Sequence, residues 1–224
     1  MKDSVLSDVK LTASSYLRKF ESLLHQIDMN ALERIVQHLR HARDSGATIY
    51  VAGNGGSAAT ASHWVNDLGK ATKLPGRAPM RVMSLSDNIS WLTALANDEG
   101  YERVFSGQLE NFARAGDVLI VISASGNSPN LVEAVELAGK RGMVTIGFLG
   151  FDGGALKNKV EEYLWLRTEK GAYGLVESGH ALLCHVLTDC LSLERVGARV
   201  NSKENDLLVS TIPFVQFNSG RKNG

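Results

Sequence analysis

The chain has 224 residues, 44% of them hydrophobic, and its 24 Lys and Arg residues balance 24 Asp and Glu residues. This length allows one well-buried core, and the zero formal net charge argues against binding of nucleic acid or an anionic membrane, because both need a basic face. Cys184 and Cys190 fit no zinc-ribbon or redox spacing. The N-terminus is polar through Lys10, unlike a signal peptide, and no apolar run approaches the ~20 residues that span a bilayer. We therefore expect a protein of the reducing cytoplasm with no membrane partner.

Two helices are predicted in the N-terminal helical region, residues 1–46. Apolar side chains recur every three or four residues from residue 6 to about residue 27, and again from residue 29 to residue 43. Gly46 is predicted to end the second helix. These amphipathic helices either cover one face of the following domain or pack against a neighbouring subunit.

Short β-rich runs then alternate with helix-like stretches. The runs are apolar nearly throughout, which is typical of strands buried on both faces of a parallel sheet. The expected strands are 47–53, 80–86, 117–123, 143–150 and 162–168, and the expected helices are 57–70, 88–114, 128–141 and 175–194. This order predicts an α/β fold, a three-layer sandwich with a five-stranded, mostly parallel sheet, over residues 47–197. Residues 198–224 form a polar tail that we expect to be loosely held.

Two of the expected strands end in small polar residues. The first continues into "GNGGS" (53–57) and the third into "SASGNS" (123–128). Ligands bind at the carboxyl ends of strands in open α/β sheets. Glycines let backbone N–H groups approach an anion, and the following helix presents its positive end. Hydroxyl donors come from Ser57, Ser123, Ser125 and Ser128.

Each loop taken alone also has a purely structural interpretation. The first is neither a Walker A loop, since no GK[ST] follows, nor a full G-x-G-x-x-G, since Ala58 stands at the third glycine position. Under the structural interpretation, the loop 53–57 only connects a strand tightly to the following helix. In the second loop, Ser125 or Asn127 caps the next helix and Pro129 lies in its first turn. Two serine-bearing loops on adjacent strands favour phosphate binding instead.

Four longer segments resemble one known family. "GNGGSAATASHWVNDL", "TALANDEGYERVFSGQL", "GDVLIVISASGNSPNLVEAVELAGKRGM" and "TIGFLGFDGG" are similar to the single-domain sugar isomerase (SIS) proteins. Within this family, the phosphoheptose isomerases and the related DnaA initiator-associating protein are the most similar. The resemblance covers roughly residues 5 to 195. It implies a homotetramer whose N-terminal helices form an oligomeric bundle, with active sites built from more than one subunit.

Two predicted helices carry residues that bind metals in other proteins. His63 and Asp67 are four residues apart and so share a helix face. Glu177 and His185 are eight apart on the last helix, about 80° apart around its axis. Two imidazoles and two carboxylates suit a tetrahedral zinc site. The alternatives are an exposed pair on one helix and a core histidine on the other.

The resemblance implies roles for these residues. It makes His63, Asp67, Glu177 and His185 the ligands of one zinc ion per subunit, with Asp67 and His185 also in acid–base catalysis. Substrate-binding positions are Asn54, Gly55, Gly56, Ser57, Asn97, Asp98, Ser123, Ala124, Ser125, Ser128 and Glu177.

Several of these positions depart from the family pattern. Asp67 stands where Glu is usual, and Glu177 where Gln is usual. Ala124 replaces a Thr. The family's Arg and Asp near these two acidic positions are replaced by Ala71 and Gly174, whereas His180 matches a position that is not a ligand.

The sequence therefore predicts an aldose–ketose isomerase of a phosphosugar. The expected reaction converts sedoheptulose 7-phosphate to D-glycero-D-manno-heptose 7-phosphate through an enediol, with assistance from a metal. Two alternatives remain open. One is a non-catalytic phosphosugar-binding or DnaA-binding adaptor, and the other is an isomerase of a different phosphosugar. The fold itself serves all three functions.

Overall fold

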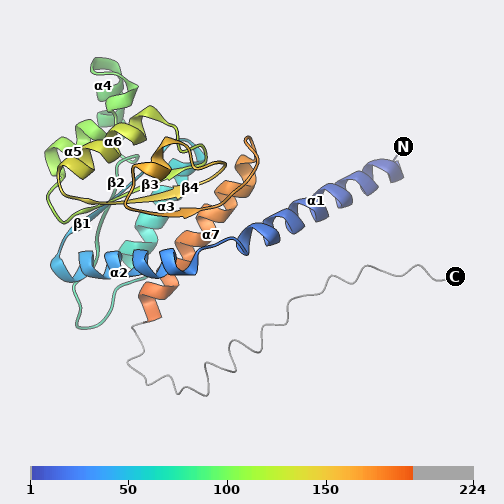
Figure 1. Ribbon diagram of the computed structural model, residues 1–224, viewed down its shortest axis with the longest axis horizontal. Coiled ribbons are helices and arrows are strands. Elements are labelled where there is room, and N and C mark those ends of the chain that lie inside the picture. Colours follow the sequence, from blue (N-terminus) through green and yellow to red (C-terminus); the bar gives the residue numbers. More distant parts are fainter. Residues whose placement is uncertain (1, 194–224) are drawn as a thin grey trace.

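The structure of the chain is a computed structural model that describes residues 2–193 (Figure 1). The predicted tail, 198–224, lies outside the described residues. Five strands form one sheet in the order β2-β1-β3-β4-β5, and all four neighbouring pairs are parallel. The strands are β1 (Thr48–Gly53), β2 (Arg81–Ser84), β3 (Val118–Ser123), β4 (Val144–Leu149) and β5 (Glu162–Trp165). The predicted five-stranded sheet is confirmed.

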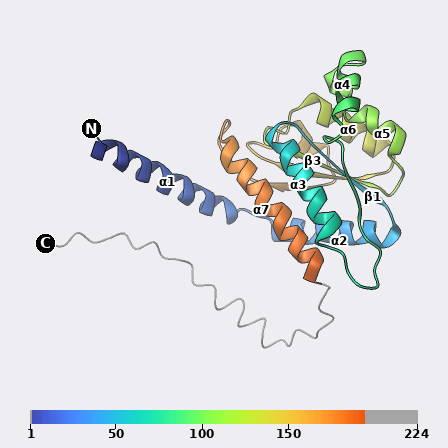
Figure 2. The same cartoon turned by 180° about the vertical axis from the view of Figure 1, so that it is seen from behind.

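Helices cover both faces of this sheet, which makes the predicted three layers (Figures 1 and 2). One face packs on α2 (Met29–Ser45), α3 (Gly56–Lys70) and α7 (Tyr173–Ser192). The other packs on α4 (Ile89–Asp98), α5 (Ser106–Phe112) and α6 (Pro129–Lys140). Alternation along β1 supplies both cores, because Ile49 and Val51 face the first layer while Tyr50 and Ala52 face the second.

The two N-terminal helices lie close to their predicted bounds. α1 (Lys2–Leu24) extends away from the sheet as a single rod (Figure 1). α2 begins after Asp28, whose side chain accepts hydrogen bonds from the backbone N–H groups of Asn30 and Ala31. It ends at Gly46, which has φ 73°, a conformation that glycine adopts at low cost.

The stretch 88–114, predicted to be helical throughout, is broken into three pieces. α4 ends at Asp98, a 3₁₀ turn follows at Tyr101–Arg103, and α5 begins at Ser106. Gly100 between the first two pieces has φ 102°, which no helix accommodates. The predicted strand 162–168 is also shorter, since β5 ends at Trp165.

α3 and α7 lie side by side and run in the same direction (Figure 2). Trp64 donates its indole N–H to the Thr188 hydroxyl at 3.2 Å, and the Ser192 hydroxyl donates to the Ala71 carbonyl at 3.2 Å. Because the helices are parallel, the start of α7 lies beside the start of α3, and the later turns of the two helices also lie beside each other. This helix pair positions His63, Asp67, Glu177 and His185. Among the described residues, no helix is both long and apolar enough to cross a membrane.

Candidate active site

The two serine-bearing loops lie together at one edge of the sheet. β1 and β3 are hydrogen-bonded neighbours, with Gly53 opposite Ile122, so their carboxyl ends point the same way. Asn54 and Gly55 connect β1 to α3, and residues 124–128 connect β3 to α6. The two loops therefore follow adjacent strands and lie at the same end of the sheet, while their binding of phosphate stays a prediction.

Both helices that follow these loops start without a side-chain cap. Gly55 occupies the cap position of α3 and Ser128 that of α6, and neither accepts a hydrogen bond through a side chain. Pro129 is the first residue of α6, as expected. The alternative caps are not found, because the Ser125 hydroxyl accepts from the N–H of Asn127 within the loop. The N–H groups of Ser57 and Leu131 already donate to the carbonyls of Asn54 and Ser128, so the N–H groups that precede them are the ones left for an anion.

The loop serines differ in burial. Ser57 and Ser123 are buried, and the Ser123 hydroxyl accepts from the N–H of Gly126 at 3.0 Å. Ser125 and Ser128 are half-buried. Ala124, in the place of the family's Thr, packs in a small apolar cluster with Phe151 and Val176. It therefore adds a backbone group and no hydroxyl to the loop.

Asn54 joins the two loops through its side chain. Its amide forms a reciprocal pair with the amide of Asn130 in the first turn of α6, with N···O distances of 3.0 and 2.9 Å. The hydroxyl of Tyr101 donates to Oδ1 of Asn54 at 3.0 Å. Sequence reasoning missed Asn130 and Tyr101, because neither residue type signals a site without its spatial partner.

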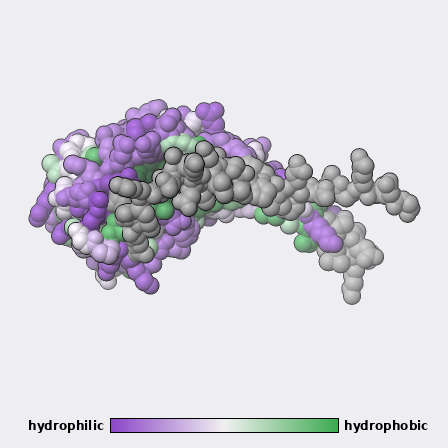
Figure 3. Space-filling view, turned by 90° about the horizontal axis from the view of Figure 1, so that it is seen from below, coloured by the Kyte–Doolittle hydropathy of each residue, from purple (hydrophilic) through white to green (hydrophobic). Residues whose placement is uncertain are grey.

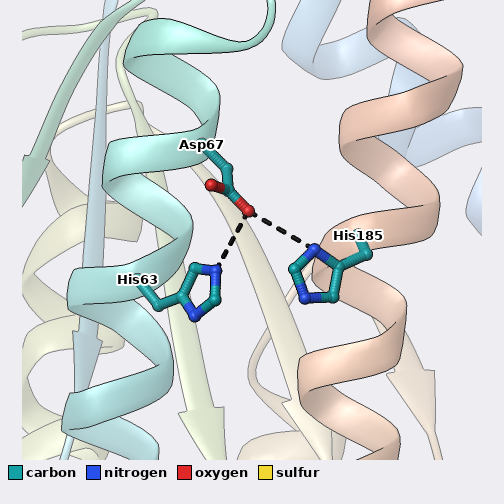
Figure 4. Close-up of side chains that lie close together, drawn as sticks. All are labelled: His63, Asp67 and His185. Atoms are coloured by element: carbon teal, nitrogen blue, oxygen red, sulfur yellow. Dashed lines mark ion pairs between the residues drawn. The ribbon is translucent and has the colours of Figure 1, made fainter.

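A second group of polar side chains lies further along α3 and α7 (Figure 4). Oδ2 of Asp67 is 3.3 Å from Nε2 of His63 and 3.4 Å from Nδ1 of His185. The two imidazole rings meet edge to face at 5.1 Å. Both histidine side chains are 58% exposed, so His185 is not the core histidine that one interpretation considered.

The three side chains fit a divalent metal. One ligand atom from each of His63, Asp67 and His185 lies within 4.8 Å of the others. Ligands of a tetrahedral zinc with bonds of ~2.0–2.1 Å are about 3.3 Å apart, which agrees with the two distances to Asp67. Two imidazoles and one carboxylate also leave a position open, the arrangement typical of catalytic zinc sites.

Both carboxylate oxygens of Asp67 have polar partners. Its Oδ2 faces both imidazoles, and its Oδ1 accepts from the side-chain amide of Asn66 at 3.2 Å. Cys184 lines a pocket together with His63 and His185. Burial, and next the Asp67 carboxylate, raise the pKa of the Cys184 thiol. Among the described residues, the group that could hold a metal ion consists of His63, Asp67 and His185 and does not include Cys184.

Glu177, the fourth residue of the predicted zinc set, lies elsewhere. Its carboxylate is next to Gly56, the first residue of α3, and so near the phosphate-type loops. The physical reason is the parallel packing of α3 and α7. Eight residues of helix separate Glu177 from His185 by about 12 Å along the axis.

Two further predicted residues, Asn97 and Asp98, make no hydrogen bond with either group among the residues that the structure describes. Asn97 and Asp98 are exposed at the end of α4, where the Asn97 amide donates to Oδ1 of Asp98 at 2.7 Å. His180 lies on the buried face of α7, and burial lowers its pKa to about 4. It is therefore a neutral core residue at neutral pH.

Comparison with known proteins places this chain in a family. The profile of the family described as SIS domain matches residues 15–150. A phosphoheptose isomerase of Citrifermentans bemidjiense is 41% identical over 164 residues, which cover 73% of this chain and 84% of that protein. The solved phosphoheptose isomerase of Neisseria gonorrhoeae is 30% identical with a TM-score of 0.73, covering 84% of this chain and 98% of that one. A phosphoheptose isomerase structure from Francisella tularensis, at 25% identity, gives a TM-score of 0.74 over the same 84% of this chain and 98% of its own.

Proposed function

Because the chain belongs to the SIS domain family and, within it, to the phosphoheptose isomerases, we propose that it interconverts sedoheptulose 7-phosphate and D-glycero-D-manno-heptose 7-phosphate. One observation carries this proposal. The glycine loop of the phosphate-type cradle leads directly into α3, the helix that also carries His63 and Asp67 of the imidazole–carboxylate group. Ser57 and His63 are six residues apart on α3, or about 9 Å along its axis, a separation that an open-chain seven-carbon sugar phosphate can bridge.

The phosphate binds at the two loops. Backbone N–H groups at Gly55, Gly56 and Ala124 face the anion. The side chains that complete the cradle are Ser57, Ser123, Ser125 and Ser128, while Asn54 contributes through the backbone of its loop. Charge-assisted hydrogen bonds of this kind are stronger than neutral ones. Asn97 and Asp98 orient the sugar hydroxyls.

Proton transfer between C1 and C2 takes place at the other end of the sugar. Isomerisation through an enediol needs a base near the carbon and an acid near the oxygens. Asp67 takes the role of base and His185 that of acid. Glu177 contacts the substrate between the two groups.

His63, Asp67 and His185 hold one divalent metal per chain, which we propose to be zinc. When bound, this ion supplies polarisation of the carbonyl and hydroxyl oxygens. Glu177 joins the ligand set only if its carboxylate leaves Gly56. Purified protein should therefore contain close to one zinc per chain by elemental analysis, and protein with no divalent metal would contradict the site.

The structure supports a non-catalytic adaptor less well than an enzyme. A protein that only binds a phosphosugar or a replication initiator needs the loops but has no use for His63, Asp67 and His185 in one group. We therefore favour the enzyme. Incubation with a panel of ketose and aldose phosphates, before and after removal of divalent metal, tests this choice. Turnover of another sugar but not of sedoheptulose 7-phosphate would favour the remaining alternative.

The assembly is proposed to be a homotetramer in the cytoplasm. α1 projects from the body, and hydrophobic atoms are visible on this projecting arm (Figure 3). Its exposed apolar side chains include Leu11 at 66% and Leu17 at 57%. A projecting helix with exposed leucines is stabilised by packing against other copies. The division into 1–46, 47–197 and 198–224 stays a prediction.

A further inference from the structure

The two phosphate loops are joined by side chains that the proposed chemistry does not use. Asn54 follows β1, and Asn130 lies in the first turn of α6 after β3. Each amide donates to the other's Oδ1, at 3.0 Å from Asn54 and 2.9 Å from Asn130. This pair of hydrogen bonds links the glycine loop to the start of the helix that follows the serine loop.

Asn54 has almost no hydrogen-bonding capacity left for a ligand. Its Oδ1 accepts from both Asn130 and the Tyr101 hydroxyl, which uses both lone pairs of a carbonyl oxygen. One of its two N–H groups is taken by Asn130. The Asn54 side chain therefore serves mainly to connect loops, while its neighbouring backbone N–H groups face the anion.

Burial of Asn130 holds the hydrogen-bonded pair of Asn54 and Asn130 in place. Asn130 is only 1% exposed, so an unpaired amide there would be costly. Tyr101 begins the 3₁₀ turn that follows α4, so its hydroxyl ties a third segment to the pair. Three segments that are distant in sequence thus meet at one amide oxygen.

We propose that Asn130 and Tyr101 are positioning residues that hold the two phosphate loops at the spacing one phosphate needs. The inference rests on the proposed function, because it assumes that both loops contact the same anion. Neither residue touches the phosphate. A displacement of about 1 Å in a binding group is sufficient to weaken the interaction strongly.

A double-mutant cycle with inorganic phosphate tests the inference. Asn54→Ala and Asn130→Ala should each weaken the calorimetric Kd for phosphate roughly tenfold, and the double variant should be no weaker than either single variant. Non-additivity of this kind is expected when two residues act as one unit. Asn111→Ala is the matched control, since Asn111 also donates its amide, to the Gly107 carbonyl, but on α5. It should leave the Kd unchanged.

Tyr101→Phe provides a variant that does not disturb the core, because this side chain is exposed. It should weaken phosphate binding about threefold, as expected for one lost neutral hydrogen bond. With a phosphosugar that is turned over, Asn54→Ala, Asn130→Ala and Tyr101→Phe should raise KM and leave kcat within about twofold. The reason is that the phosphate is held equally in the ground state and in the transition state. A purely structural role would lower the unfolding midpoint without this split.

The possible outcomes distinguish failure of the proposed phosphate cradle from failure of the positioning role of Asn130 and Tyr101. If the wild-type chain binds no phosphate, the cradle itself is refuted and this inference falls with it. If the wild-type chain binds phosphate and Asn130→Ala and Tyr101→Phe bind it equally well, the proposed function stands and the positioning role is overturned. Additive losses in the double variant would also overturn it.

Discussion

The carboxylate of Glu177 lies over Gly56 at the start of α3. A Cβ atom added to Gly56 would be 2.5 Å from Oε1 and 2.7 Å from Cδ of Glu177, so only glycine permits this approach. A carboxylate at a helix N-terminus is stabilised by the helix dipole. At this position it also lies beside the loops that we propose for phosphate, where two negative charges repel each other.

Glu177→Gln should separate these two effects. Loss of the charge should tighten phosphate binding about two- to fivefold, because a partly screened repulsion of about 0.5–1 kcal/mol is removed. The same change should lower the free energy of unfolding by about 0.3–1 kcal/mol, through the lost interaction with the helix dipole. Calorimetry and urea titration measure the two quantities.

Glu169→Gln serves as the control, because Glu169 is exposed and precedes α7. It should change neither quantity. Weaker phosphate binding by Glu177→Gln would mean that the carboxylate accepts hydrogen bonds from the ligand.

His185→Ala should separate turnover from binding. An acid acts mainly in the transition state, so kcat should fall by about 10²–10⁴-fold while phosphate affinity stays nearly unchanged. Metal content should fall as well, because one of three ligands is lost. His41→Ala, on the exposed face of α2, should match the wild type in all three measurements.

Asp67 provides the complementary comparison. Asp67→Asn should abolish turnover, and Asp67→Glu should keep or raise it by restoring the family's longer side chain. Full activity of Asp67→Asn with metal still bound would make Asp67 a ligand only and would move the search for the base to Glu177.

His180 should make stability depend on pH. Burial lowers its pKa from 6.5 to about 4, against a smaller opposing contribution from the Leu149 backbone. Between these two pH values the unfolded chain binds a proton that the folded chain does not, so stability is unaffected by His180 above pH 6.5 and falls as the pH drops below it. At pH 5 the loss should be about 2 kcal/mol.

Urea titrations at pH 8 and pH 5 measure this loss. His180→Leu should reduce the difference between the two pH values by about 2 kcal/mol, whatever its effect on stability at pH 8. His41→Ala should leave the difference unchanged. An undiminished difference in His180→Leu would mean that other groups cause the pH dependence.

Leu17→Glu on α1 tests the assembly. The leucine is 57% exposed in the isolated chain, and a buried charge at a subunit contact is unfavourable. Light scattering should show a tetramer for the wild-type chain and smaller species for Leu17→Glu. A wild-type chain that is monomeric at micromolar concentration would refute the proposed bundle.

The central strands β1, β3 and β4 could be predicted from sequence because they are buried on both faces, whereas the edge strands β2 and β5 are partly exposed. A run such as "DVLIVIS" has no polar face, which suits only a strand inside a parallel sheet. The break at Gly100 was harder to foresee, because a glycine within a helical pattern does not reveal a φ of 102°.

The site was predictable only in part. His63 and Asp67 belong to one helix, so their proximity follows from spacing. The placement of His185 beside them and of Glu177 beside Gly56 depends on α7 running parallel to α3, which no local pattern encodes. The same holds for Asn54, Asn130 and Tyr101, which come from three segments.

The most direct test of the proposed isomerase is proton exchange during turnover. Sedoheptulose 7-phosphate is incubated with the zinc-loaded protein in D₂O and followed by proton NMR. The account predicts that an aldose phosphate forms and that solvent deuterium enters at its C2, because the proton moves through an enediol. His185→Ala should show neither change. Binding of the sugar phosphate by the wild-type chain without product and without deuterium would contradict the isomerase and favour a binding protein.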